Sequence, residues 1–141
     1  MLKVISDVAV GNDKPVIVPA NRRYTVKSIM AVLLSTATVG NRSLTVDWMD
    51  DASNVLMRAI TGAVQAASLT NRYNINPSAP RGTAFVANQI DIPIPTIYLQ
   101  PAWRVRIYDA ANIAVLDTLS VFVTVNDRDM KSTDGVADDL G

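Results

Sequence analysis

The stretch "LQPAWRVRIYD", residues 99–109, decides the fold class of this chain. From residue 103 onward apolar and polar side chains alternate, which is the pattern of a half-buried β-strand. Residues 100–102 form the turn that leads into the strand. A nucleic-acid-binding stripe would need a wider basic surface, and the other arginines are scattered along the chain. The apolar side of the strand carries Trp103, Val105 and Ile107, and the polar side carries Arg104, Arg106 and Tyr108.

The composition extends this interpretation to the whole chain. The 141 residues include no Glu and only three Gln and four Lys, so several favoured helix formers are scarce. The chain contains 18 Val, 11 Ile, 11 Thr and 10 Asn, a mixture of β-branched and turn-forming residues. This composition predicts an all-β domain, and the length suffices for one domain with its own core.

Several chemistries lack their usual residues. Without Cys or His there is no disulfide framework, no thiolate nucleophile and no base to activate a serine such as Ser6, Ser28 or Ser120. The glycines are scattered, with no phosphate-binding loop. The formal net charge is zero, which does not predict a nucleic-acid partner, and no run of apolar residues is long enough to span a membrane. We therefore expect no enzyme activity and no cofactor.

Strand-like segments recur about every ten residues without amphipathic helices between them, which is typical of a sandwich or barrel. We predict a single-domain β-sandwich, jelly-roll-like, over residues 21–126, with an N-terminal arm at 1–20 and a polar, flexible tail at 127–141. The tail has little apolar surface, so we expect it to be dispensable. The pattern at 63–69 fits either a short helix or a strand. The expected strands are 2–10, 16–18, 22–39, 43–49, 55–61, 83–86, 89–92, 96–100, 103–108 and 117–126.

The longest expected strand, residues 22–39, is apolar on both sides in its middle. Tyr24, Val26 and Met30 share one side by a period of two, and Ile29 and Leu33 share the other. This pattern predicts a strand that is covered on both faces.

The N-terminal arm is the first candidate contact segment. It begins without the basic region and long apolar stretch of a signal peptide, so we expect no Sec export. A turn cluster and two prolines separate its apolar residues from the body, and an unpaired strand could add to the sheet edge of another protein or of a neighbouring subunit. The alternative is that the arm is the first strand of its own sandwich. The candidate contact residues in it are Leu2, Val4, Ile5, Val8, Val16 and Ile17.

Two other segments are candidate contact sites. Residues 70–82 are polar and rich in Pro and Asn, and we interpret them as a loop in which Arg72 and Tyr73 could contact a partner. Arg104 and Arg106 form an outward pair that could dock an acidic partner. Asp47, Asp50 and Asp51 around residues 50–54 could hold Ca²⁺, but the spacing is not that of an EF-hand, and the segment reads better as a hairpin turn. Trp48 is predicted to lie in the core.

Four segments together resemble a sandwich domain of tailed-bacteriophage virion proteins. They are "YTVKSIMAV" (24–32), "SLTVDWMD" (43–50), "IPIP" (92–95) and the segment 101–125, which contains "RVRIYDAANIAVLDTLSVFVTV". The resemblance covers about residues 20–126 and is to phage head decoration (cement) proteins and related accessory virion proteins. In such proteins the turn before the Trp is often Pro-Gly, and Ala102 stands in the place of that Gly.

The resemblance implies a structural virion protein that is made in the host cytoplasm and sits on the capsid surface. Its expected partners are the major capsid protein and further copies of itself, most simply as a homotrimer that stabilises contacts between capsomers. One alternative is a receptor- or carbohydrate-binding sandwich of a tail fibre or spike. A second alternative is a neck or head-completion protein.

Overall fold

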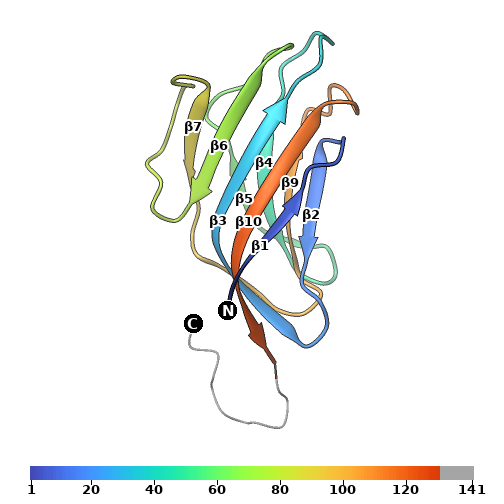
Figure 1. Ribbon diagram of the computed structural model, residues 1–141, viewed down its shortest axis with the longest axis vertical. Coiled ribbons are helices and arrows are strands. Elements are labelled where there is room, and N and C mark those ends of the chain that lie inside the picture. The colour runs from blue at the N-terminus through green and yellow to red at the C-terminus, as the bar shows by residue number, and fades with distance from the viewer. Residues whose placement is uncertain (131–141) are drawn as a thin grey trace.

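The computed structural model describes residues 1–130, so residues 131–141 of the expected tail lie outside the described residues. Ten strands form two sheets that pack face to face, and no helix occurs in residues 1–130 (Figure 1). The predicted all-β sandwich is therefore confirmed. The strands are β1 (Leu2–Asp7), β2 (Asp13–Ile17), β3 (Arg22–Leu34), β4 (Leu44–Met49), β5 (Val55–Ile60), β6 (Thr70–Asn76), β7 (Gln89–Pro93), β8 (Ile97–Leu99), β9 (Arg104–Asp109) and β10 (Thr118–Asp129).

The larger sheet has the order β1-β10-β3-β6-β7, and β8 pairs with the first part of β3, where β6 does not reach. The smaller sheet has the order β2-β9-β4-β5. Only the β6–β7 pair is parallel among these strands. Pro93 ends β7 at a sheet edge, as expected of a residue that cannot donate to a ladder.

Residues 99–109 adopt the structure that their alternation of apolar and polar side chains predicts. Val105 and Ile107 of β9 are fully buried between the sheets, whereas Arg106 and Tyr108 lie on the outer face. In the turn before β9, the Ala102 amide donates to the carbonyl of Val18 at 2.9 Å. Ala102 has a φ of 68°, a conformation that Gly adopts without strain. This geometry explains why Gly would suit the same place in related sequences.

The expectation that both faces of the long β3 strand are covered is wrong, because a bulge changes the facing of its side chains. The pairing with β10 shifts between Thr124 and Val125, so that Lys27 is the extra residue of β3. Tyr24 and Val26 before the bulge therefore share the buried face with residues 29, 31 and 33 after it. Met30 is left on the outer face, which no other strand of residues 1–130 covers.

Some boundaries differ from those expected. Residues 63–69 form neither a helix nor a strand; they make turns, with a single bridge between Arg42 and Gln65. Residues 83–86 are not a strand, and Val86 makes only an isolated bridge with Gln89. β10 continues to Asp129, beyond the expected end at 126, because Asp127 accepts hydrogen bonds from Arg22 at 2.8 Å and Lys3 at 3.5 Å.

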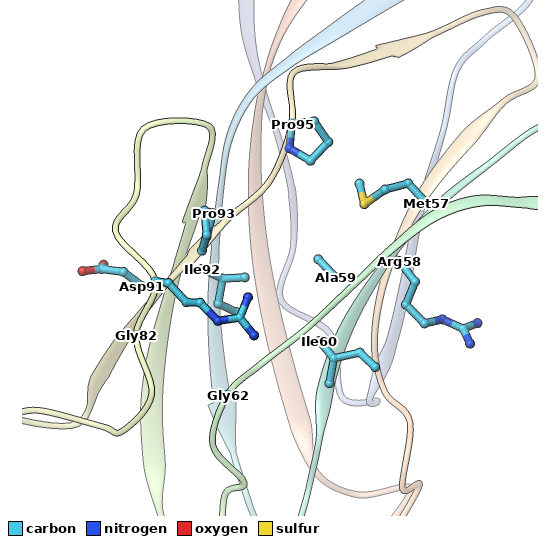
Figure 2. Close-up of a pocket in the computed structure, with 11 residues that line it drawn as sticks. Met57, Arg58, Ala59, Ile60, Gly62, Gly82, Asp91, Ile92, Pro93 and Pro95 are labelled. Atoms are coloured by element: carbon cyan, nitrogen blue, oxygen red, sulfur yellow. The ribbon is translucent and has the colours of Figure 1, made fainter.

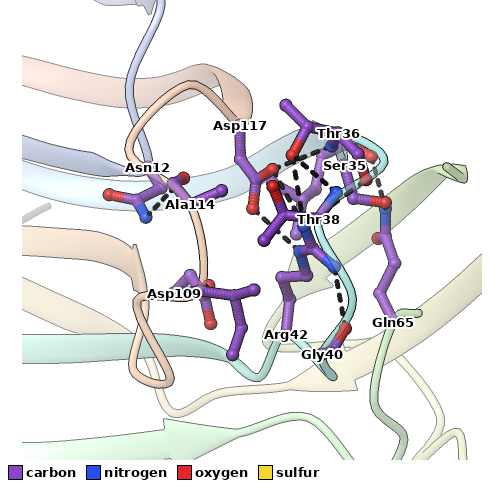
Figure 3. Close-up of polar contacts among 12 residues, drawn as sticks. Asn12, Ser35, Thr36, Thr38, Gly40, Arg42, Gln65, Asp109, Ala114 and Asp117 are labelled. Carbon is purple, nitrogen blue, oxygen red and sulfur yellow. Dashed lines mark hydrogen bonds and ion pairs between the residues drawn. The ribbon is translucent and has the colours of Figure 1, made fainter. Parts of the chain in front are cut away.

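A buried ion pair joins two connections at one end of the sandwich (Figure 3). Arg42 follows β3 and Asp117 precedes β10, and both side chains are fully buried. The guanidinium donates to the two carboxylate oxygens at 2.9 and 3.2 Å, and to the carbonyl of Gly40 at 2.7 Å. The backbone N–H of Thr36 donates to the same carboxylate at 2.8 Å. The bonds to Asp117 join the connection after β3 to the connection before β10, and the bond to Gly40 lies within the first of these.

Gln65 extends this network toward the larger sheet. Its amide nitrogen donates to the carbonyls of Leu33 and Leu69 at 2.8 and 3.0 Å, and its oxygen accepts from the hydroxyl of Tyr73 at 2.8 Å. Burial raises the pKa of Tyr73, which therefore stays protonated as a donor. A residue outside any strand thus fixes the 61–69 connection against β3 and β6.

We predict that Asp117→Leu lowers the free energy of unfolding by about 3–5 kcal/mol, because it leaves the Arg42 guanidinium buried without its carboxylate. The double variant Arg42→Met/Asp117→Leu should be more stable than Asp117→Leu alone, since no uncompensated charge remains. Urea denaturation measures wild type, Arg42→Met, Asp117→Leu and the double variant, with the exposed turn variant Asp51→Asn as a control near wild type. If the two single substitutions simply add, the pair does not act as one unit.

The same carboxylate predicts a loss of stability in acid. Burial alone would raise the pKa of Asp117, but the hydrogen bonds from Arg42 and Thr36 outweigh it, so the pKa lies below its ordinary value of 3.8. The unfolded chain therefore takes up the proton first, and the stabilisation is present above pH 3.8 and is lost as the pH falls through the folded-state pKa. Denaturation curves between about pH 5 and pH 2 should show this loss, and Asp117→Asn should show a smaller one. Equal pH slopes for both proteins would contradict it.

Candidate functional site

The outer face of the smaller sheet carries a chain of ion pairs across its four strands. Asp13 of β2 accepts two hydrogen bonds from Arg106 of β9, at 2.8 and 2.7 Å. Asp47 of β4 accepts two from Arg58 of β5, at 2.7 and 3.0 Å. Asp47 is almost fully buried although it lies on the outer face, because these long side chains cover it. This face therefore satisfies its own charges.

Tyr108 links the two ion pairs. The guanidinium of Arg106 lies 3.8 Å from the centroid of the Tyr108 ring, and the Tyr108 hydroxyl donates to Asp47 at 2.8 Å. Burial would raise the pKa of Asp47, but hydrogen bonds from Arg58 and then Tyr108 outweigh it and lower that pKa. Burial and the bond to Asp47 raise the pKa of Tyr108.

The two candidate arginines of β9 are placed differently from one another. Arg106 is engaged on both sides by Asp13 and the Tyr108 ring, so its charge is neutralised within the chain. Arg104 is half-buried, and its Nε has no hydrogen-bond partner among residues 1–130. The predicted outward pair thus exists in geometry, but one member already has its acidic partner in the same sheet.

The outer face of the larger sheet carries a group of apolar side chains among polar ones such as Arg72, Ser120 and Thr124. The register places Phe122 of β10 opposite Met30 of β3, and Val4 of β1 opposite Thr124 on the same side. Phe122 is 36% exposed, Met30 40% and Leu34 51%. The sequence did contain the signal, since Met30 and Phe122 occupy strand positions where an exposed face would carry polar residues. We call this set the apolar face; it consists of Leu2, Val4, Met30, Val32, Leu34 and Phe122.

The arm residues divide between the two sheets. β1 pairs with β10 of its own chain over all six residues, which is the arrangement in which the arm is the first strand of its own sandwich. β1 is also the edge of the larger sheet, so its far side has no strand partner among residues 1–130. Leu2, Val4 and Val8 are exposed, Ile5 is half-buried, Val16 of β2 is in the core and Ile17 is exposed.

The interpretation of residues 70–82 as one polar loop needs correction. Residues 70–76 form β6, which lies inside the larger sheet between β3 and β7. Tyr73 points into the core, is fully buried and meets the Phe85 ring edge-on at 5.5 Å, so it is not available for contact. Arg72, its neighbour on the strand, lies on the outer face and is exposed. The alternation of apolar residues 73 and 75 with polar neighbours was the signal for a strand.

A cleft opens between β5 and β7, the edge strands of the two sheets (Figure 2). Its cavity volume is about 360 Å³. Met57 and Ala59 line one wall, Ile92 and Pro93 line the other, and Arg58 directs its guanidinium away from the gap. A Cβ on Gly62 would lie 2.7 Å from the carbonyl oxygen of Gly82, so close backbone approach ends the cleft there. No aromatic residue is among the described residues that line it.

Asp50 stabilises the hairpin turn at residues 50–54. The Asp50 carboxylate accepts hydrogen bonds from the backbone of Ala52 and Asn54, both at 2.9 Å, and these bonds lower its pKa together with the Asn54 side-chain bond, which is the largest cause. Within residues 1–130 no group of three acidic side chains could hold a metal ion. No helix in that range is long and apolar enough to cross a membrane.

No protein-family model matches the chain, and no curated protein matches it. Among solved structures, the chain is similar to one in the structure of infectious bursal disease virus, Gx strain. The TM-score is 0.36 and the sequence identity 8%, over 92% of this chain and 41% of that chain. This chain therefore spans less than half the length of the other. Similarity at this level says nothing about function.

We predict that Tyr108→Phe lowers the free energy of unfolding by about 1–2 kcal/mol, because the ring stays under Arg106 while the hydrogen bond to Asp47 is lost. The pKa of Asp47 should rise, and an NMR titration of its carboxyl carbon measures that shift. The matched control is Tyr98→Phe, which removes a hydroxyl from a half-exposed ring that has no hydrogen-bond partner among residues 1–130. An unchanged Asp47 titration in Tyr108→Phe would show that the hydroxyl does not support the carboxylate.

Proposed function

We propose that this protein is a non-enzymatic structural component of a tailed-phage virion, which binds the outside of the head as an oligomer and stabilises contacts between capsomers. The sequence resemblance supplies the class of protein. Its main segments correspond to parts of β3 and β10 and to β4 and β9, which are inner strands of the two sheets. The expected partners are the major capsid protein and further copies of this chain.

The observation that carries this proposal is the apolar face. Met30 of β3 and Phe122 of β10 lie opposite each other on the outer face of the larger sheet, and no other strand of residues 1–130 covers them. Contiguous exposed apolar patches on soluble proteins mark contact sites. The most economical cover is a second copy of the same chain, since a symmetric assembly presents the same face on every subunit.

The mechanism is adhesion rather than chemistry. Burying the apolar face between subunits removes apolar surface from water, and each subunit of an oligomer then offers its remaining surface to the shell. Several weak contacts to the shell act together once the subunits are linked, so the assembly binds far more tightly than one chain. A protein of this kind strengthens a shell without any single strong site.

The arm contributes to the same surface. Leu2 and Val4 extend the apolar face across β1, and the unpaired edge of β1 offers backbone donors and acceptors to a neighbouring strand. In this proposal the arm contacts a neighbouring subunit while it remains part of its own sheet.

We predict that Met30→Lys/Phe122→Lys converts a homotrimer into a monomer, because the two ammonium groups would lose hydration in the subunit contact. Light scattering on the eluting protein measures the mass. The control Leu56→Lys introduces the same charge on an exposed apolar residue of β5, outside the apolar face, and should leave the mass unchanged. A wild-type chain that is monomeric at about 10 μM, well above the Kd of a stable assembly, contradicts self-association. If the variant keeps the wild-type mass, the apolar face is not the contact between subunits.

A further inference from the structure

At one end of the sandwich the connections between strands contain almost no charge, and the nearest exposed charges are those of Asp7 and Asp13 at the adjoining strand ends. Four connections meet there, because the register brings the end of β3, β5 and β9 and the start of β4, β6 and β10 to the same side (Figure 1, top). These connections are residues 8–12, 35–43, 61–69 and 110–117, which we call the uncharged end. Their only charged residues are Arg42 and Asp117, which are fully buried and paired with each other. The opposite end carries exposed Asp51 and Asp129.

Large apolar side chains project from the same connections. Val39 is 91% exposed, Val115 70% and Leu116 69%. A recess with a volume of about 390 Å³ lies between the 35–43 and 110–117 connections. Its lining includes Thr36, Thr38, Ile113, Val115 and Leu116. The surface thus combines apolar projections with a hollow that an apolar side chain can enter.

These connections are held in place before any partner binds (Figure 3). The Arg42–Asp117 pair joins two of them, and the Asp109 carboxylate accepts backbone bonds from Ser43 at 2.9 Å and Ala111 at 3.0 Å. Asn12 donates to the side chain of Asn112 at 3.0 Å, which joins the 8–12 connection to the others. A surface that is already ordered loses little conformational entropy when it binds.

The chemistry of this end selects the kind of partner. A lipid surface is met by exposed Lys or Arg and by Trp or Tyr, and the four connections contain no aromatic residue and no exposed basic one. A charged protein surface would lose hydration against valines without gaining a partner charge. An uncharged, apolar protein surface with a projecting apolar side chain fits both the missing charges and the recess.

We propose that the uncharged end is the surface that docks onto the shell protein, at an uncharged apolar site of that protein. This inference rests on the proposed function. The apolar face and the uncharged end are separate surfaces, one for copies of the chain and one for the shell. In a cyclic trimer every subunit presents its uncharged end toward the same side of the ring, so three such ends can contact one shell together.

The test uses particles purified without this protein, to which the full chain is added and the bound fraction is measured by sedimentation. Wild type should bind, with little change between about 50 and 500 mM NaCl, since screening acts on charges and this contact has none. Val115→Asp/Leu116→Asp should bind about 100-fold more weakly or worse, because two carboxylates would be buried without partners. The control Val55→Asp adds a carboxylate at the opposite end of the sandwich and should bind as wild type does.

The possible outcomes distinguish a failure of the proposed function from a failure of the docking proposal. No binding of the wild type to the particles contradicts the proposed function itself. Equal binding of wild type and Val115→Asp/Leu116→Asp, or strong weakening of wild-type binding by salt, overturns the docking end while the proposed function stands. Sedimentation of the wild type with phosphatidylcholine–phosphatidylserine vesicles would assign the end to lipid instead and also overturns it. Should the double variant fail to fold, Val39→Asp on the other connection gives the same decision.

Discussion

The buried pair of Arg42 and Asp117 is the interaction on which one whole end of this sandwich depends. Two charges out of water are unfavourable unless their hydrogen bonds are nearly complete, and here the guanidinium reaches both carboxylate oxygens and the Gly40 carbonyl. The pair lies outside the apolar core and joins connections that leave β3 and enter β10. Because it consumes the only two charges of the four connections, the exposed part of those connections is left without charge. One interaction therefore both orders this surface and determines its chemistry.

The outer faces of the two sheets differ in the side chains that they present to water. On the smaller sheet, Asp13 pairs with Arg106 and Asp47 pairs with Arg58, so both carboxylates are satisfied within the chain. Exposed apolar side chains remain on its two edge strands, at Ile17, Leu56 and Ile60. On the larger sheet, Met30 and Phe122 stand next to each other in water. In our proposal the larger sheet is the surface for association, since Met30 and Phe122 lie on its inner strands, and covering them is favourable and displaces no existing ion pair.

The sequence predicted the elements whose identity is set locally. The alternation of residues 103–108 defined β9, and the hairpin at residues 50–54 followed from turn chemistry. What it could not reveal was set by pairing between distant segments. The bulge at Lys27 depends on the register with β10. It puts Met30 on the face opposite to Tyr24 and Val26, whereas a strict period of two would put all three on the same face. Tyr73 was taken for a loop residue because its polar neighbours resemble a loop, whereas the sheet places them on an outer face. The partnership of Arg42 with Asp117, 75 positions apart, left no local signature.

Locating the protein on the particle tests the central claim, adhesion to the outside of the head, most directly. Electron cryomicroscopy of purified particles, combined with a copy-number measurement, shows where each chain sits. The account predicts many copies distributed over the outer shell at junctions between capsomers, with the connections that carry Val39 and Leu116 directed toward the shell. Copies confined to a single vertex, to the neck or to a tail fibre would contradict it.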